Sequence, residues 1–119
     1  MGTDCRYSVG LMTRIELLAA STLQAWLQRH PGWTLRPRAS GDHEALVRSF
    51  PTADFASGLA LVMRVGVIAE RRNHHPDIAL SWGKVEVAWT THDAGGISAL
   101  DVELAELTEL AVREPLSQG

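Results

Sequence analysis

The chain has 119 residues, of which 45% are hydrophobic and 21% are charged, and its formal net charge at pH 7 is −3. This length predicts one domain, and the lack of a basic surplus argues against direct binding to nucleic acid or to anionic membranes. The single cysteine, Cys5, cannot form an internal disulfide, which is typical of a reducing cytoplasm.

Residues 1–20 are expected to form an N-terminal extension that is mobile or weakly ordered, because they combine glycines with mixed polarity. The ordered domain is then predicted to span residues 21–115. Charged residues such as Arg14 and Glu16 interrupt the apolar patches near the N-terminus, and no apolar run has the length of a membrane helix. We therefore expect a soluble, cytoplasmic protein without a targeting segment.

The domain is predicted to begin with a short helix and a β-hairpin. Ser21 and Gln24 have the spacing of a capping box, and a Pro-Gly pair after residue 30 should end the helix that they start. Residues 33–36 and 45–50 are typical of short strands, with a turn-rich loop between them. His43 lies in this loop and is expected at the protein surface.

A long helix is predicted over residues 53–73, with Thr52 as its cap. Its interior polar residues, Ser57, Arg64 and Arg71, recur every seven positions and form one narrow stripe. Most of the remaining circumference is apolar, which is more than one sheet can cover. We therefore expect the second apolar side to be buried by self-association, as a dimer or a larger oligomer.

A second hairpin and a last helix complete the domain. Residues 78–82 and 85–91 are predicted to be strands joined by a tight turn. Ser98 and Asp101 form another capping box, and the helix that follows should end near Pro115. The order helix, hairpin, helix, hairpin, helix predicts an α+β fold, a two-layer sandwich in which helices cover one face of an antiparallel sheet.

The stretch from residue 70 to residue 101 contains the groups best suited to proton transfer, at defined intervals. They are Glu70, then after three residues His74-His75-Pro76, after five Trp82, after nine His92, and after eight Asp101. Because proline restricts the residue before it, the histidine pair should lie where the long helix ends. Strict strand alternation directs His92 to the side of Glu86, and a bulge would turn it; both arrangements are open at this point.

These residue types at these intervals resemble the signature of the pterin-4a-carbinolamine dehydratase family. The resemblance extends from about Trp33 to about Leu110 when the PGW and SFPTADF segments are included. It implies a four-stranded antiparallel sheet covered on one face by three helices, and assembly into dimers or tetramers. It also implies a hydro-lyase that dehydrates 4a-hydroxytetrahydropterin to quinonoid dihydropterin in tetrahydropterin recycling, without a metal or bound cofactor.

The expected reaction needs an acid for the departing hydroxyl group and a base for the proton on the adjacent ring nitrogen. Histidine, with an ordinary pKa of about 6.5, suits both tasks at neutral pH. The resemblance therefore makes His74 and His92 the principal acid and base, in an order that stays open, and lets His75 bind the substrate or assist. Substrate-binding or orienting roles are implied for Glu70, Pro76, Trp82 and Asp101.

Plainer interpretations exist for several of these residues. Asp101 is explained as the partner of the Ser98 cap at a helix N-terminus, and Glu70 as a solvated carboxylate. The three histidines with Asp101 could also bind a metal, although adjacent histidines usually point apart and the HExxH helical spacing is absent.

A non-catalytic role is the alternative from another class of function. Members of the resembled family are known as dimerisation cofactors of a transcription factor, and relatives as assembly chaperones for RuBisCO. The histidine pattern is complete in this chain, which favours catalysis over an interaction role alone.

Overall fold

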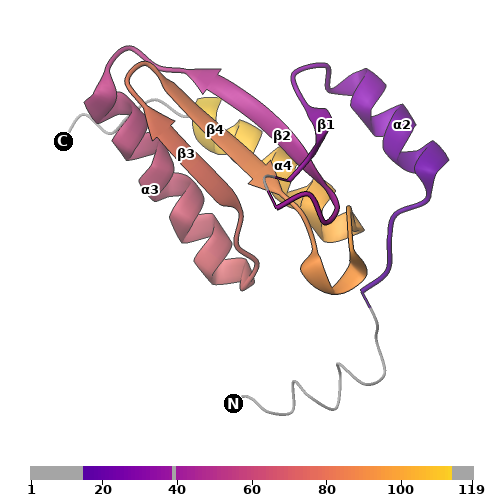
Figure 1. The fold of residues 1–119 in the computed structure, drawn as a ribbon. Helices are drawn as coiled ribbons and strands as arrows, with labels where there is room; N and C mark the ends of the chain where they lie inside the picture. The colour runs from indigo at the N-terminus through magenta and orange to yellow at the C-terminus, as the bar shows by residue number, and fades with distance from the viewer. Residues whose placement is uncertain (1–14, 39, 114–119) are drawn as a thin grey trace.

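The computed structural model describes residues 15–38 and 40–113. Helices and pairs of strands alternate as the sequence predicts (Figure 1). They are α2 (Ala20–Arg29), β1 (Thr34–Pro37), β2 (Glu44–Pro51), α3 (Phe55–Arg72), β3 (Asp77–Ser81), β4 (Lys84–Trp89), the short 3-10 helix η1 (His92–Ala94) and α4 (Ala99–Arg113).

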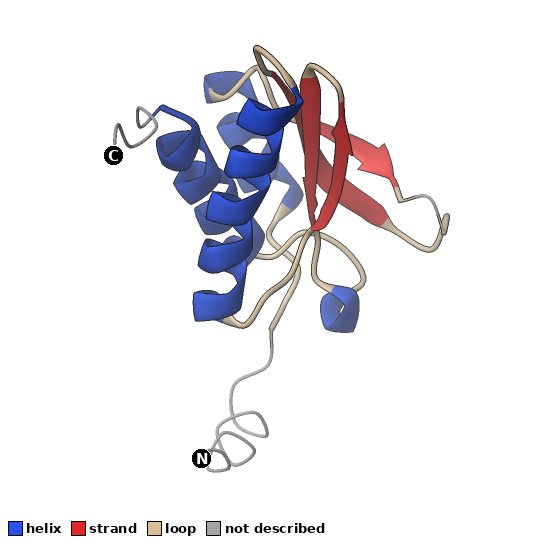
Figure 2. Ribbon diagram, turned by 90° about the vertical axis from the view of Figure 1, so that its left-hand side faces the viewer, coloured by secondary structure: helices blue, strands red, loops and turns tan. Residues whose placement is uncertain are grey.

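The four strands form one antiparallel sheet with the order β1-β2-β4-β3. Helices α3 and α4 lie side by side against one face of this sheet (Figure 2). The residues of β4 that point toward them, Val85, Val87 and Trp89, are fully buried. Helix α2 joins the same core through Trp26, whose indole N–H donates to Glu106 on α4 at 2.8 Å. The predicted two-layer α+β architecture is confirmed.

Helix α3 has two apolar sides that meet different surroundings. Leu61, Val65 and Ala69 recur at helical spacing and are buried against the sheet. Gly58 belongs to the same side, and a Cβ at this position would lie 2.7 Å from Leu80 Cδ1, so glycine permits close approach to β3. The opposite side carries four exposed apolar residues, which we call the α3 stripe: Phe55, Leu59, Met63 and Val67.

Two of the three predicted helix caps are wrong. Helix α2 starts one residue before the proposed capping box, and its N-cap residue is Ala19, which makes no side-chain capping bond. Helix α3 is capped by Asp54, whose carboxylate accepts a 2.8 Å hydrogen bond from the N–H of Ser57. Thr52 lies two residues before this cap, where its N–H donates to Gly83 O at 2.9 Å and its hydroxyl donates to Asp54 O at 3.3 Å.

Other predicted boundaries change by a few residues. Strand β4 ends at Trp89, two residues before its predicted end, and Thr91 continues only as an isolated bridge to Gly96. Of the predicted N-terminal extension, residues 1–14 lie outside the described residues, whereas Leu18 donates its N–H to Ile97 O at 2.8 Å and packs against the core. Pro115 also lies outside the described residues. Within residues 15–38 and 40–113, no helix combines the length and apolar character needed to cross a membrane.

Candidate active site

Sheet register explains why distant residues meet at one end of the molecule. Strand β4 pairs Trp89 with Leu46 on one side and Ala88 with Asp77 on the other. Extending each register by three residues places His43 opposite His92 and His74 opposite Thr91. The chain segments that flank three strands therefore converge where β4 ends, and this end carries two of the three histidines of the signature.

The turn that ends α3 places His74 near the end of β4. Asn73 adopts a left-handed conformation with φ 51° and ψ 44°, and His74 N–H donates back to Ala69 O at 3.1 Å. Such a turn is a common helix ending, and asparagine tolerates the left-handed region better than most residues. The His74 side chain, 13% exposed, then lies parallel to the indole of Trp89, with ring centroids 6.1 Å apart.

A fully buried carboxylate holds the His74 ring. Asp101 Oδ1 lies 2.7 Å from His74 Nε2. Asp101 Oδ2 accepts the hydroxyl of Thr91 at 2.6 Å and the N–H of Ser98 at 2.8 Å, and the Ser98 hydroxyl lies 3.1 Å away. We call these four residues the Asp101 network. Both carboxylate oxygens are satisfied without water, which makes the network a fixed element of the core.

The Asp101 network also fixes a tautomer. A carboxylate oxygen accepts hydrogen bonds, so Nε2 of His74 is the nitrogen that donates, and Nδ1 of the neutral ring carries the free lone pair. The predicted capping box is present in one half: Asp101 returns to the Ser98 N–H, while the Ser98 hydroxyl faces Asp101 and Thr91. Sequence reasoning missed Thr91, although it stands next to His92.

The second histidine of the pair points elsewhere. His75 Nε2 lies 2.9 Å from Glu70 Oε1, and both side chains are mostly solvent-exposed, at 58% and 82%. Pro76, half-buried, follows and leads directly into β3. Glu70 and His75 thus form a pair at the protein surface, separate from the Asp101 network.

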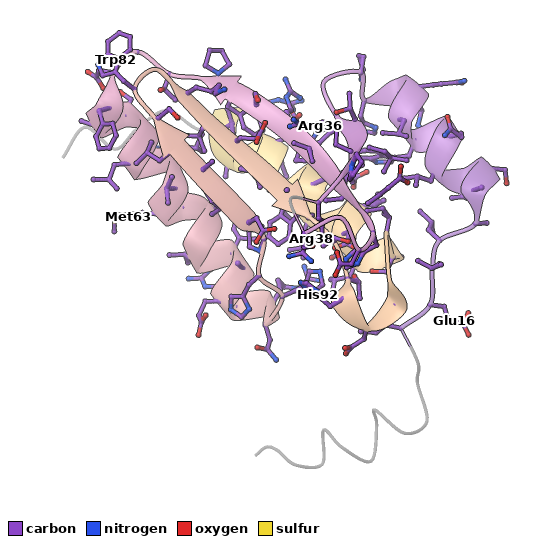
Figure 3. The ribbon with its side chains drawn as sticks, viewed as in Figure 1. Glu16, Arg36, Arg38, Met63, Trp82 and His92 are labelled. Carbon is purple, nitrogen blue, oxygen red and sulfur yellow. The ribbon has the colours of Figure 1, made fainter. Side chains whose placement is uncertain are left out.

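His92 begins η1, is exposed, and packs its ring edge-on against His43, with centroids 5.3 Å apart. The expectation that His43 is a surface residue is wrong, since its side chain is only 9% exposed. His43 Nδ1 lies 3.3 Å from Asp42 Oδ1, and Asp42 also accepts a hydrogen bond from Arg38 at 3.2 Å. The hydroxyl of Ser40 holds the pKa of the Asp42 carboxyl below its usual value, with neighbouring His43 and Arg38 acting in the same direction. Figure 3 shows Arg38 and His92 at the same end of the sheet.

Trp82 lies far from these groups within one chain. It is 74% exposed in the turn between β3 and β4. This turn lies beside the N-terminus of α3, because the next residue, Gly83, accepts a hydrogen bond from the N–H of Thr52. His74 follows the other end of this 18-residue helix, roughly 27 Å away along its axis. Figure 3 shows Trp82 and His92 at opposite ends of the molecule. The structure therefore does not bring Trp82 to the histidines.

A cavity of ≈ 560 Å³ is lined in part by His43. Residues of α2, of the segment before it, of the loop leading into β2, and of the segment after η1 surround it, with Leu23, His43 and Gly96 among them. Its walls combine apolar side chains with a few polar groups, which is typical of small-molecule sites.

Comparisons with known proteins agree with the motif. The family model described as "Pterin 4 alpha carbinolamine dehydratase" matches residues 9–111. A candidate pterin-4-alpha-carbinolamine dehydratase of Chlorobaculum tepidum is 45% identical over 95 residues, covering 80% of this chain and 84% of that protein. One of Thermosynechococcus vestitus is 40% identical over 98 residues, covering 82% and 97%.

A solved structure shares the fold. The crystal structure of a "transcriptional coactivator/pterin dehydratase" from Brucella melitensis superposes with a TM-score of 0.69 at 26% identity, and covers 81% of this chain and 98% of that one.

Proposed function

This chain belongs to the pterin 4 alpha carbinolamine dehydratase family, and we propose that it dehydrates a 4a-hydroxytetrahydropterin to the quinonoid dihydropterin. The observation that carries the proposal is the hydrogen bond between His74 and the buried Asp101, because it presents an imidazole in a single orientation and tautomer. Fixed geometry of this kind is what acid–base catalysis needs.

The reaction breaks one C–O bond and moves two protons. An acid donates a proton to the departing 4a-hydroxyl group, which leaves as water, while the lone pair of N5 forms the new C=N bond. A base removes the proton from N5, so the pterin product is neutral. One group gains a proton and one loses a proton in each turnover, and exchange with solvent restores both.

We assign the base to His74 and the acid to His92. The His74 ring donates from Nε2 to Asp101, which leaves Nδ1 to accept a proton. Asp101 then stabilises the cation that forms. His92 is the second imidazole at this end of the sheet and is exposed to solvent, from which it can be reprotonated. His75 and Glu70 lie at the protein surface where α3 ends, and they are proposed to bind and orient the substrate.

The test is a stopped-flow measurement of carbinolamine decay with and without the purified protein. We expect decay well above the buffer rate and above the rate with free imidazole at a concentration matched to the protein's histidines. An enhancement no larger than that of free imidazole would refute the enzymatic function.

An interaction role is the second candidate, and the α3 stripe favours it. Four apolar side chains, 47% to 65% exposed, follow one side of the helix, and Met63 lies on its outer side (Figure 3). Exposed apolar patches of this kind mark association sites. We propose that the stripe mediates self-association of the chain, which is compatible with catalysis at the far end of α3.

Charge on the stripe tests this role. Met63→Lys should dissociate the native oligomer, because it places an ammonium group in an apolar contact while leaving the core unchanged. Gln28→Lys, on the exposed side of α2, adds the same charge elsewhere and should leave the oligomer intact. Sedimentation velocity at micromolar concentration measures both, and a monodisperse wild-type monomer would rule out self-association.

A further inference from the structure

His43 contains a buried polar atom that the fold does not satisfy. Its Nδ1 lies 3.3 Å from Asp42 Oδ1, but its Nε2 is buried and has no hydrogen-bond partner among the described residues. Leaving such an atom unpaired costs roughly 1–3 kcal/mol, and most buried nitrogens in proteins are paired. A ligand that accepts a nitrogen lone pair would remove this cost.

Two further donor groups lie beside the His43 ring. Asp42, His43 and His92 each offer one ligand atom, and these atoms all lie within 4.8 Å of one another. Zinc binds imidazole nitrogen and carboxylate oxygen at about 2.0–2.2 Å, which places ligand atoms of a tetrahedral site roughly 3.3 Å apart. His92 is exposed and can rotate by the remaining distance, whereas the His43 side chain is 9% exposed and held by the fold.

The carboxylate is already oriented for this task. Arg38 Nη1 donates to both oxygens of Asp42 at 3.2 and 3.3 Å, and the Ser40 hydroxyl donates at 2.6 Å. Metal-binding carboxylates are usually hydrogen-bonded in this way, and a carboxylate retains lone pairs for a further ligand. The guanidinium charge near the site repels a cation, so we expect micromolar affinity.

We propose that Asp42, His43 and His92 bind one divalent transition-metal ion of the zinc class, with water completing its coordination. Two imidazoles among three ligands favour such an ion over magnesium or calcium, which prefer oxygen. This set differs from the metal site considered from the sequence, because His74 is engaged by Asp101.

Occupancy of the site has a consequence that rests on the proposed function. An imidazole that binds a metal through one nitrogen cannot be protonated to the imidazolium, so an ion on His92 removes the acid of the dehydration. Zinc should therefore act as a reversible inhibitor, and a chelator should restore activity. The Asp101 network is left intact by the ion.

Binding is tested by titrating tag-free protein with zinc chloride in a calorimeter. The wild-type chain should bind one ion, and His43→Gln and Asp42→Asn should each weaken binding by tenfold or more. His30→Gln is the control: His30 also lies near a carboxylate, with 4.0 Å from Nε2 to Glu106 Oε2, and its replacement should leave binding unchanged. Circular dichroism confirms that each variant is folded.

Activity separates this proposal from the proposed function. The dehydration rate of His43→Gln in metal-free buffer serves as its own reference, and zinc concentrations that silence the wild-type chain should leave that rate unchanged. Zinc binding that needs His43 and Asp42 in a chain without dehydratase activity would uphold the metal site and refute the enzyme. No zinc binding, or binding that survives both replacements, would overturn the metal site while leaving the enzyme untouched.

Discussion

Two adjacent histidines each pair with a carboxylate, yet the two pairs differ in almost every other respect. His74 and Asp101 lie 2.7 Å apart, and His75 and Glu70 lie 2.9 Å apart. The first pair is 13% and 0% exposed, and the second is 58% and 82% exposed. Similar bond lengths therefore do not mean similar strength, because solvent screens the exposed pair and leaves both its side chains free to move.

The difference arises from the partners of each carboxylate. Three donor groups of Thr91 and Ser98 hold the Asp101 carboxylate in place. The His74 imidazole therefore binds to a fixed acceptor. The Glu70 carboxylate has His75 as its single hydrogen-bond partner among the described residues. The buried pair is suited to positioning a catalytic ring, and the exposed pair to adjusting around a ligand.

The largest effect should come from His74→Ala. Removing the proposed base should lower turnover by roughly 10²- to 10⁴-fold, measured by stopped flow after subtraction of the buffer rate. The fold and the oligomeric state should be unchanged, since the side chain lies at the edge of the core. His92→Ala should cause a loss of the same order, and the double replacement should cost much less than the product of the two. Full activity in His74→Ala would contradict the assignment.

Asp101→Asn should have the next largest effect. An amide in place of the carboxylate presents an N–H group either to Thr91 and Ser98 or to His74, so one donor loses its acceptor or the His74 tautomer is reversed. We expect turnover to fall on the order of 100-fold and the free energy of unfolding to fall by about 1–3 kcal/mol. Urea denaturation measures the second quantity. The matched change Glu70→Gln, at the exposed pair, should alter stability by less than about 1 kcal/mol. Equal losses in both variants would remove the distinction between the pairs.

A smaller effect is expected for His75→Ala. Its side chain is exposed and bonded to a mobile carboxylate, so its loss should raise KM several-fold while kcat remains near the wild-type value. Steady-state kinetics over a range of substrate concentrations separate the two constants. His30→Ala, far along α2, should change neither. A fall in kcat as large as that of His74→Ala would mean that His75 takes part in proton transfer.

Sequence patterns predicted the fold well because periodicity reports burial directly. The apolar run of α3 and the alternation of Val85, Val87 and Trp89 identified the long helix and a central strand. Helix starts were less predictable, since Thr52 is a good capping residue that the second hairpin holds elsewhere. Tertiary contacts decided between Thr52 and Asp54.

The site was predicted as a set of residues, but its connections were not. Spacing explained Asp101 as a helix cap, and only the folded chain shows that the same carboxylate also holds His74. The contact between His43 and His92 joins residues 49 positions apart and depends on the register of β2 with β4. No local sequence pattern predicts the register of β2 with β4. Trp82 has the spacing of the motif but lies far from the histidines, because spacing along the sequence does not ensure proximity in the folded chain.

Helix α3 takes part in both proposed functions, through different side chains. Its outer side carries the stripe centred on Met63, and its last turn delivers His74 to Asp101. Mutations that abolish proton transfer therefore leave the outer surface intact, and mutations that remodel the surface leave the histidine in place. Natural selection can act on the proposed chemistry and the proposed association independently, so a descendant of this chain can lose one and retain the other.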